Sequence, residues 1–360
     1  MKFGEFMAGL RRGLKHVYLL AGAERYYIER AQTAILARLF PAGVQPDDVQ
    51  RVGAAAGAQQ LAELIETVPF LTDKNMLLVE DSPLFRTAAK GEEEEKPKGH
   101  GRKKAAKDAP MERLTRLLLA MPEDSYVIFV LHDKPDKRKK LVKTIEKAGA
   151  VLEAEPLRPW QVGDWLRDKL DSLGRDMDRD AYEYFMGAIS MMQQVSLSYL
   201  DREFDKLALF SREKRITKRE LLAVFSGLPE VSVFALADAV SAKDVRKALA
   251  LLTRELADGT YFTVLIALLA RHVRQLMEAR ILLGEGLRGR QLAKPLALNP
   301  FIAEKLARAA QGFSDEQLTR ALLELADADY LMKTGKGGSE LLEHIIIGLC
   351  ATPARGQRRR

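Results

Sequence analysis

The spacing of apolar residues divides the chain into two parts. Up to about residue 156, short uninterrupted apolar runs alternate with segments in which apolar residues recur every three or four positions. The segments predict helices over 24–40, 59–67 and 136–147, with a further helix from Met111. The runs predict strands over 17–21, 49–52, 76–79, 126–131 and 150–155. Because buried runs separated by helices are typical of a parallel sheet covered on both faces, we predict a five-stranded α/β domain of the nucleotide-binding type.

From Pro159 onward the helical spacing continues almost to the end of the chain. Thr217 with Glu220, and Ser314 with Gln317, have the spacing of helix capping boxes. The Gly-Leu-Pro sequence at 227–229 breaks this pattern, so we place a domain boundary there. The predicted organisation is a sheet domain over 1–156, a small all-α domain over 157–227, an all-α bundle of six helices over 228–350 and a basic tail over 351–360.

Residues 90–109 do not continue the sheet pattern. They are rich in Glu, Lys and Gly and nearly devoid of large apolar side chains, so they bury too little surface to offset the entropy of ordering. We predict a disordered surface insertion. Its basic half either contacts DNA or is simply solvated.

Composition excludes several classes of protein. Cys350 is the only cysteine, which excludes a disulfide framework and a cysteine zinc site and suits a reducing cytosol. We expect no membrane span and no signal peptide, because no apolar run is long enough and the first residues lack an apolar core. The formal net charge of +7 permits an acidic partner such as nucleic acid but does not require one.

The turn after the first strand is where a nucleotide-binding sheet usually holds phosphate, with the pattern G-x-x-x-x-G-K-[ST]. Gly22 occupies the first position, but the last three positions are Tyr27, Ile28 and Glu29. The second glycine, the lysine and the hydroxyl are therefore all missing, and Glu24 adds a negative charge beside the helix start. We predict that this degenerate phosphate loop does not bind ATP.

No other stretch supplies a catalytic centre. Glu80 and Asp81 end the third strand and are interpreted as a solvated strand end. The Gly-rich segment 334–339 follows no strand, and Ser339 is better explained as the cap of the last helix. The five histidines are scattered without metal-ligand spacing, and His272 fits a packed side chain. We expect no catalytic residue, no metal and no cofactor.

An apolar turn precedes the third strand. Pro69 ends the preceding helix because the residue before proline is pushed out of the α region. Val68, Phe70 and Leu71 then lie at the turn, beside Thr72 and two charged residues. Large apolar side chains at such a tip either fold back into the core or bind a partner. The failure of the phosphate loop makes the contact interpretation the stronger one.

Several stretches, taken together in their order, make the chain resemble the delta subunit family of bacterial DNA polymerase III, from Val17 to about Leu349. They are the degenerate loop 18–24, the Phe70–Leu71 pair, the basic segment 136–143, and the segments 203–207, 233–239 and 331–335. The resemblance implies an AAA+-related sheet domain, a helical lid over 157–227 and a helical collar over 228–350 that joins a clamp-loader ring.

The resemblance also implies a function. It implies a non-catalytic subunit of the replicative DNA-directed DNA polymerase that opens the beta sliding clamp for loading on primed DNA without hydrolysing ATP. The implied partners are the beta clamp, the tau/gamma ATPase subunits, the delta-prime subunit and primer-template DNA, in the bacterial cytoplasm at the nucleoid-associated replisome. The clamp-binding positions that correspond in this sequence are Val68, Pro69, Phe70 and Leu71.

DNA contact and two other functions stay open. Between Lys134 and Lys147 there are seven Lys or Arg against two acids, and this surface either contacts DNA phosphates or is a solvated helix face. The candidate contacts are Lys137, Arg138, Lys139, Lys140 and Lys143. The alternatives to a clamp-opening subunit are an active AAA+ ATPase with an atypical phosphate loop and a DNA-binding adaptor.

Overall fold

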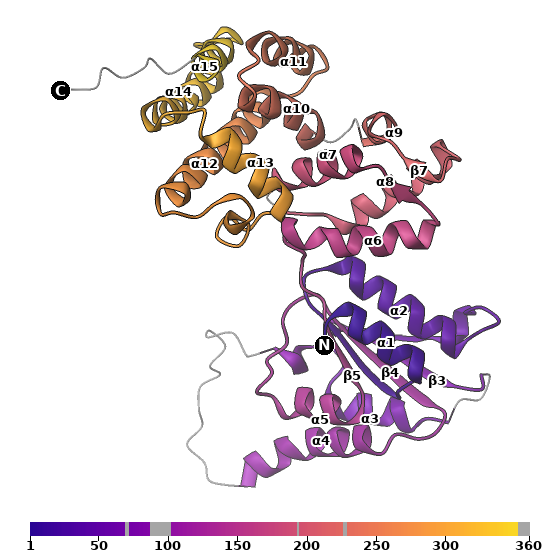
Figure 1. Cartoon of the computed structure of the whole chain (residues 1–360). Coiled ribbons are helices and arrows are strands. Elements are labelled where there is room, and N and C mark those ends of the chain that lie inside the picture. Colours follow the sequence, from indigo (N-terminus) through magenta and orange to yellow (C-terminus); the bar gives the residue numbers. More distant parts are fainter. Residues whose placement is uncertain (69–71, 87–101, 193, 226–228, 352–360) are drawn as a thin grey trace. The chain divides into compact units, whose positions relative to one another are not determined.

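The computed structural model describes residues 1–68, 72–86, 102–192, 194–225 and 229–351 (Figure 1). Contacts divide the chain into two compact units, Met1–Pro156 and Leu157–Arg360. We call them the sheet unit and the helical unit. The further division predicted at residue 227 stays a prediction. None of the described helices is both long and apolar enough to cross a membrane.

The sheet unit contains five parallel strands in the order β2-β3-β4-β1-β5, which confirms the predicted fold class. Its strands are β1 (Val17–Ala21), β2 (Gln50–Val52), β3 (Asn75–Glu80), β4 (Ser125–Leu131) and β5 (Ala150–Glu153). Its helices are α1 (Phe3–Arg12), α2 (Arg25–Leu39), α3 (Ala58–Glu66), α4 (Arg102–Leu119) and α5 (Lys140–Ala148), with short 3-10 turns at Pro46–Asp48 (η1) and Pro83–Phe85 (η2).

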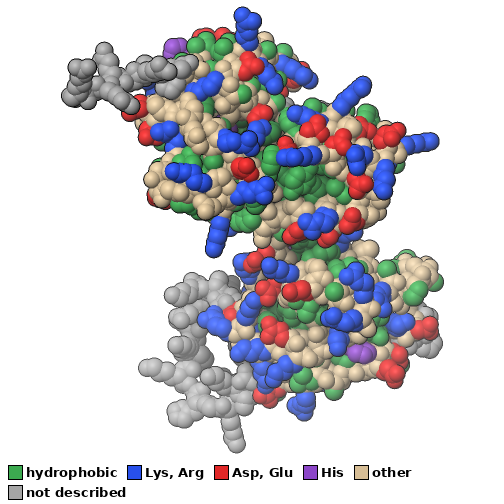
Figure 2. All heavy atoms as spheres, viewed as in Figure 1, with side chains coloured by type: hydrophobic (Ala, Val, Ile, Leu, Met, Phe, Trp, Pro, Cys, Tyr) green, Lys and Arg blue, Asp and Glu red, His purple; other side chains and the backbone are tan. Residues whose placement is uncertain are grey.

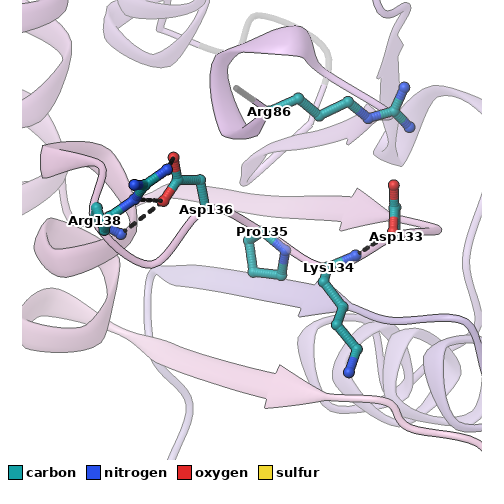
Figure 3. Close-up of a pocket in the computed structure, with 6 residues that line it drawn as sticks. All are labelled: Arg86, Asp133, Lys134, Pro135, Asp136 and Arg138. Atoms are coloured by element: carbon teal, nitrogen blue, oxygen red, sulfur yellow. Dashed lines mark hydrogen bonds and ion pairs between the residues drawn. The ribbon is translucent and has the colours of Figure 1, made fainter. Parts of the chain in front are cut away.

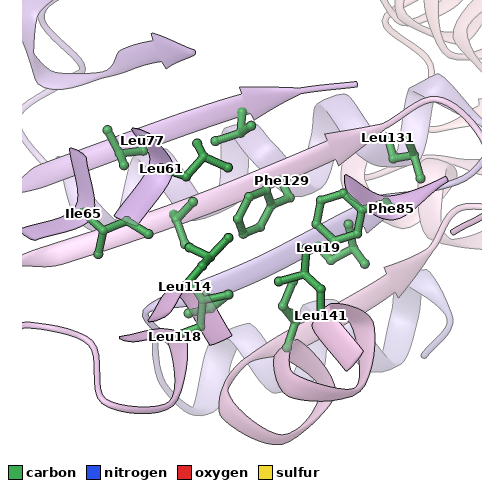
Figure 4. Close-up of a cluster of buried hydrophobic side chains, with 14 of the residues drawn as sticks. Leu19, Leu61, Ile65, Leu77, Phe85, Leu114, Leu118, Phe129, Leu131 and Leu141 are labelled. Carbon is green, nitrogen blue, oxygen red and sulfur yellow. The ribbon is translucent and has the colours of Figure 1, made fainter. Parts of the chain in front are cut away.

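Both faces of the sheet are buried. Alternate residues of β1 point to opposite sides, so that Leu19 packs with Phe129 and Leu141 while Tyr18 and Leu20 pack on the other face. Helices α3, α4 and α5 cover the first face and α1 and α2 cover the second (Figures 1 and 4). This double burial explains why the strands read as continuous apolar runs.

Two helix starts in the sheet unit differ from the prediction. Helix α4 begins at Arg102 and not at Met111, so the end of the predicted insertion 90–109 is helical, and residues 87–101 lie outside the described part. The Lys- and Ala-rich residues before Pro110 are good helix formers, which accounts for the earlier start. Helix α5 begins at Lys140 and not at Asp136, for a reason given with the site below.

The helical unit begins with η3 (Pro159–Gln161), α6 (Val162–Leu173), α7 (Arg179–Ser190), α8 (Leu197–Phe210) and α9 (Lys218–Val224). Two short strands, β6 (Asp176–Met177) and β7 (Arg215–Ile216), pair in parallel and add a small sheet to a region predicted as all-α. Strands of two residues are too short to show a period in the sequence. The predicted capping box is present, with Thr217 N donating to Glu220 Oε2 at 2.8 Å.

The remaining helices are α10 (Pro229–Ser241), α11 (Val245–Ala257), α12 (Phe262–Gly284), α13 (Pro300–Ala310), α14 (Asp315–Lys333) and α15 (Glu340–Cys350), with η5 at Gly289–Leu292. They match the six helices predicted beyond residue 228. Ser314 Oγ accepts a hydrogen bond from Gln317 N at 3.1 Å, as its predicted cap role requires. Ser339 stands at the cap position of α15, but its side chain makes no capping hydrogen bond.

Candidate functional site

The turn after β1 is closed by the protein's own backbone. Gly22 N donates to Leu131 O at 2.9 Å and Glu24 N donates to Ala154 O at 3.0 Å. Gly22 has a φ of 141°, and a Cβ built on it would lie 2.0 Å from Ala154 O. Gly22 is therefore required by its backbone conformation and by close packing, and these two amide groups point at carbonyls of the chain instead of at an open cradle.

The N-terminus of α2 is occupied by a carboxylate of the same chain. Glu24 is buried, and its Oε1 accepts a hydrogen bond from Tyr26 N at 3.1 Å. A phosphate would need these same helix-terminal donors. Burial raises the pKa of Glu24, the hydrogen bond from Tyr26 N opposes that rise, and the charge of Glu29 adds to it.

The three altered positions of the phosphate-loop pattern have other contacts. The ring of Tyr27 stacks on Phe3 of α1 with centroids 4.5 Å apart, and Ile28 is buried in the core under α2. Glu29 is exposed. A helix that precedes the sheet thus packs on the loop, a contact between distant segments that the spacing of the motif does not reveal.

Asp81, at the end of β3, forms a network instead of a solvated strand end. Its Oδ1 accepts from His132 N at 3.2 Å, its Oδ2 lies 3.0 Å from His132 Nδ1, and Arg86 donates to Oδ1 at 3.1 Å. The hydrogen bond with the His132 side chain, more than any other contact, lowers the pKa of Asp81. Glu80 fits the prediction better, because it is exposed and its ion pair with Arg51 is 3.5 Å long.

An open hollow of about 440 Å³ lies beside this network (Figure 3). Its lining consists of Arg86, Asp133, Lys134, Pro135, Asp136 and Arg138. Each of its three cations already has an acidic partner in the sheet unit, with distances of 3.1 Å for Arg86–Asp81, 2.9 Å for Lys134–Glu155 and 3.0 Å for Arg138–Asp136. Figure 3 shows Arg86 pointing away from Arg138, so these cations do not converge on one anion.

The basic segment after β4 is largely neutralised. Lys137 Nζ donates to Glu153 at 2.7 Å, and Lys139 Nζ donates to Leu84 O at 3.0 Å. Asp136 accepts from both the backbone and the guanidinium of Arg138, which holds residues 136–138 in a turn. For that reason α5 starts only at Lys140.

Two of the five candidate DNA contacts differ from the others. Lys140 and Lys143 are exposed on α5 and form no ion pair with any described residue. If this segment contacts phosphate, Lys140 and Lys143 can do so without first breaking an ion pair within the chain.

The connection between α3 and β3 begins with an exposed apolar residue. Helix α3 ends at Glu66, and Val68 is 83% exposed. On the β3 side, Thr72 Oγ1 donates to Lys74 O at 2.9 Å. Pro69, Phe70 and Leu71, the other predicted contact residues, lie outside the described residues.

Asn75 holds this connection at its base, a role that the sequence analysis missed. Its buried side-chain amide donates to Leu64 O at 2.8 Å, to Ile65 O at 3.2 Å and to Thr67 O at 3.0 Å. Leu64 and Ile65 lie in the last turn of α3 and Thr67 is its C-cap, so the amide supplies donors at a helix end, where few backbone donors remain. The sequence contained one signal for this role. Asn75 is a polar amide at the start of an apolar run, and a buried amide needs a hydrogen-bond partner.

His272, another residue considered for a functional role, has a structural one. His272 is buried and lies 2.7 Å from Ser241 Oγ, as expected for a packed side chain. Burial lowers the pKa of His272 to about 4, so the imidazole is neutral near pH 7. Over the described part of the chain, no group of three or more His, Cys, Asp or Glu could hold a metal ion.

Comparison with known families gives two matches. The family model described as "DNA polymerase III, delta subunit" matches residues 18–155, and that described as "DNA polymerase III delta subunit, C-terminal domain" matches residues 230–349. Together they cover well over half of the chain.

Individual proteins agree with the family matches. A Bacillus subtilis (strain 168) protein named "DNA polymerase III subunit delta" is 24% identical over 345 residues, 94% of each chain. An Aquifex aeolicus (strain VF5) protein named "Probable DNA polymerase III subunit delta" is 25% identical over 240 residues, which are 65% of this chain and 66% of that protein. The solved structure of the "Bacillus subtilis DNA clamp loader delta protein (YqeN)" has the same fold, with a TM-score of 0.58 and 20% identity over 97% of this chain and 99% of that one.

Asn75→Ala tests the anchoring of the α3–β3 connection. Removal of the amide takes the donor from Thr67 O and leaves Leu64 O and Ile65 O with only Thr67 N and Ser125 Oγ as donors, so we expect the free energy of unfolding to fall by about 1–3 kcal/mol. Urea unfolding followed by circular dichroism measures the change. Gln59→Ala, which removes an exposed amide from the same helix, is the control and should change stability by less than about 0.5 kcal/mol. Equal losses in the two variants would contradict the anchoring role.

Asp81→Asn tests the Asp81–His132 network through its pH dependence. A carboxyl group whose pKa is lowered in the folded state stabilises the fold above its unfolded pKa and loses that contribution as the pH falls. The advantage of the wild type over Asp81→Asn should therefore be present near neutral pH and shrink below the ordinary pKa of 3.8. Urea unfolding midpoints over a pH series measure this difference. Glu80→Gln, at the neighbouring exposed carboxylate, is the control, and an advantage independent of pH would contradict the assignment.

Proposed function

The chain belongs to the DNA polymerase III delta subunit family, and from this premise we propose that it binds and opens the beta sliding clamp for loading on primed DNA, without hydrolysing ATP. The supporting observation is the exposed Val68 that follows α3, with the end of this helix held by Asn75. The Bacillus subtilis structure is named as a clamp loader delta protein, which is consistent with this role.

The absence of ATP hydrolysis is supported by what fills the loop after β1. The carboxylate of Glu24 caps the α2 N-terminus, and the amides of Gly22 and Glu24 bond to carbonyls of the chain. A nucleotide phosphate would have to displace a negative group from the helix terminus that it needs. This subunit then contributes binding energy to clamp loading, and its ATPase neighbours contribute the chemistry.

The proposed contact with the clamp consists of Val68, Pro69, Phe70 and Leu71. Burial of the Phe70 and Leu71 side chains in a pocket of the clamp would contribute roughly 3–6 kcal/mol. A micromolar complex requires about 8 kcal/mol, so this pair is adequate as the central anchor, with surrounding contacts supplying the rest. The 83% exposure of Val68 supports a chain that enters this segment at the protein surface.

Opening of the clamp follows if the pair binds the open interface better than the closed one. A ligand shifts a conformational equilibrium only by its difference in affinity for the two states. We propose that the tau/gamma and delta-prime subunits control access to the pair.

A candidate contact for these subunits lies in the helical unit. It is a groove of about 660 Å³ between α12 and α14. Its lining combines apolar side chains such as Ile266, Ala270 and Leu325 with charged ones such as Arg274. Subunit interfaces also combine apolar and charged side chains.

Primer-template DNA is the remaining proposed partner. Lys140 and Lys143, on the exposed face of α5, are the candidate residues that best fit phosphate contact, because the other three candidates, Lys137, Arg138 and Lys139, bond within the chain.

Phe70→Ala combined with Leu71→Ala tests the clamp contact. Loss of both apolar side chains should weaken the complex with the purified beta clamp of the same organism at least a hundredfold, as measured by surface plasmon resonance. Leu323→Ala combined with Tyr330→Ala is the matched control. These α14 side chains are 63% and 62% exposed, and their removal should leave clamp affinity unchanged. Unchanged clamp affinity in the Phe70/Leu71 variant would overturn the assignment.

A nucleotide titration separates the proposal from an active AAA+ ATPase. We expect a fluorescent ATP analogue with Mg²⁺ to show no saturable binding to the isolated chain, because Glu24 and the closed backbone occupy the phosphate position. Tight binding would favour the ATPase. A chain that binds primed DNA but not the clamp would instead be a DNA-binding adaptor.

A further inference from the structure

Helix α8 ends in two exposed apolar side chains. Leu209 is 87% exposed and Phe210 is 63% exposed, whereas Leu207, two residues before Leu209, is buried. Leu222 of the adjoining helix α9 is 37% exposed. Large apolar side chains scattered singly over a surface need no explanation, but these two are neighbours at a helix terminus.

The backbone around this pair is fixed. Arg175, which follows α6, donates through Nη2 to Ala208 O at 2.9 Å and to Ser211 O at 2.5 Å, and through Nη1 to Glu213 O. One guanidinium therefore satisfies carbonyls on both sides of the pair. The exposed position of Leu209 and Phe210 is thus held by bonds within the chain.

Four exposed cations follow the pair within ten residues. They are Arg212, Lys214, Arg215 and Arg219. Arg212 and Arg219 form no hydrogen bond or ion pair with the described residues. The contacts of Lys214 with Asp176 at 3.9 Å and of Arg215 with Asp178 at 3.5 Å are long and exposed, and such pairs contribute little to stability. Figure 2 shows Lys and Arg side chains projecting from the region where Figure 1 places β7 and α9, with acidic side chains among them.

One of the nearby acids is already bound. Glu220 accepts from Thr217 N and from Thr217 Oγ1, both at 2.8 Å, and a hydrogen bond from Ser211 is the chief cause of its lowered pKa. Lys218 lies over the Tyr184 ring at 4.3 Å and is a poorer candidate for an outside partner. The positive charge available to a partner is therefore that of the four cations named above.

We propose that this surface, made by the end of α8, β7 and the start of α9, binds single-stranded nucleic acid. The exposed ring of Phe210 offers a face on which a base can stack, and Arg212 and Arg219 are available to phosphates. A flat exposed ring beside several cations is the combination that single strands require, because their bases are unpaired. Duplex DNA would use the cations but not the ring. The surface belongs to the helical unit and includes none of residues 68–71, Lys140 and Lys143, and the proposal does not depend on the clamp-opening role.

Binding of fluorescein-labelled oligothymidine to the full chain, measured by fluorescence anisotropy over a salt series, tests the proposal. Phe210→Ala should weaken binding roughly fivefold to a hundredfold, the range found for loss of one base–aromatic stack. Arg212→Ala with Arg219→Ala should weaken binding and reduce the slope of log K against log salt by about 1.4, the expected loss for two phosphate contacts with a single strand.

Two control variants carry the same chemical changes elsewhere in the helical unit. Tyr330→Ala removes an aromatic ring of nearly equal exposure, 62%, from α14. Arg246→Ala with Arg320→Ala removes two exposed arginines from α11 and α14. Neither should change oligothymidine binding, and thermal unfolding of each variant checks that the fold is kept.

Three results would overturn the proposal. They are the absence of oligothymidine binding by the wild type, equal losses in the test and control variants, and preferential binding of the wild type to phosphatidylglycerol vesicles. Clamp affinity of the Arg212/Arg219 variant should stay at the wild-type value, so a failure here is distinct from a failure of the clamp-opening proposal.

Discussion

Pairing of the backbone at the carboxyl edge of the sheet is the constraint on which the sheet unit depends. A parallel sheet buried on both faces brings the amides and carbonyls of several strand ends together, and each buried group needs a partner. In nucleotide-binding proteins part of that need is met by phosphate. In this chain it is met internally, by Ala154 O for Glu24 N, by the Glu24 carboxylate for Tyr26 N and by the Asp81 carboxylate for His132 N. These three amides therefore have partners without a ligand.

The opposite, amino edge of the sheet serves as a rigid mount. The same sheet ties down the α3–β3 connection, because Asn75 at the start of β3 bonds to the last carbonyls of α3 and Ser125 at the start of β4 donates to Ile65 O at 3.0 Å. The exposed Val68 therefore follows a helix end whose backbone is held in place by hydrogen bonds. A binding element on a fixed base loses less conformational entropy on contact with a partner than one on a loose loop.

The strands and helices could be predicted from the sequence because burial on two faces gives continuous apolar runs, and helices buried on one face give a regular spacing. The degeneracy of the phosphate loop was likewise visible, since Tyr27, Ile28 and Glu29 lack the required chemistry. The predicted start of α5 was wrong because the turn made by Asp136 and Arg138 competes with a helix that the spacing alone favours.

Side chains that hold distant backbone were not predictable in the same way. Asn75 and Arg175 each satisfy carbonyls of another element, and nothing in their local spacing reveals which carbonyls those are. The stacking of Phe3 on Tyr27 is of the same kind, because it joins a helix before the sheet to the loop after β1. Such residues lie where the fold brings sequence-distant groups together, so periodicity cannot place them.

In the proposed function the subunit has no chemistry of its own and acts only through differences in binding affinity. The proposed anchor of two apolar side chains would supply roughly 3–6 kcal/mol, less than the total for a micromolar complex. Contacts around the anchor must then provide the remainder, so a modest change in those contacts is enough to release the partner. A larger anchor would bind the clamp in every conformational state of the neighbouring subunits. The difference in affinity on which opening depends would then be lost. The small size of the clamp contact proposed at 68–71 is therefore consistent with the reversible opening that we propose.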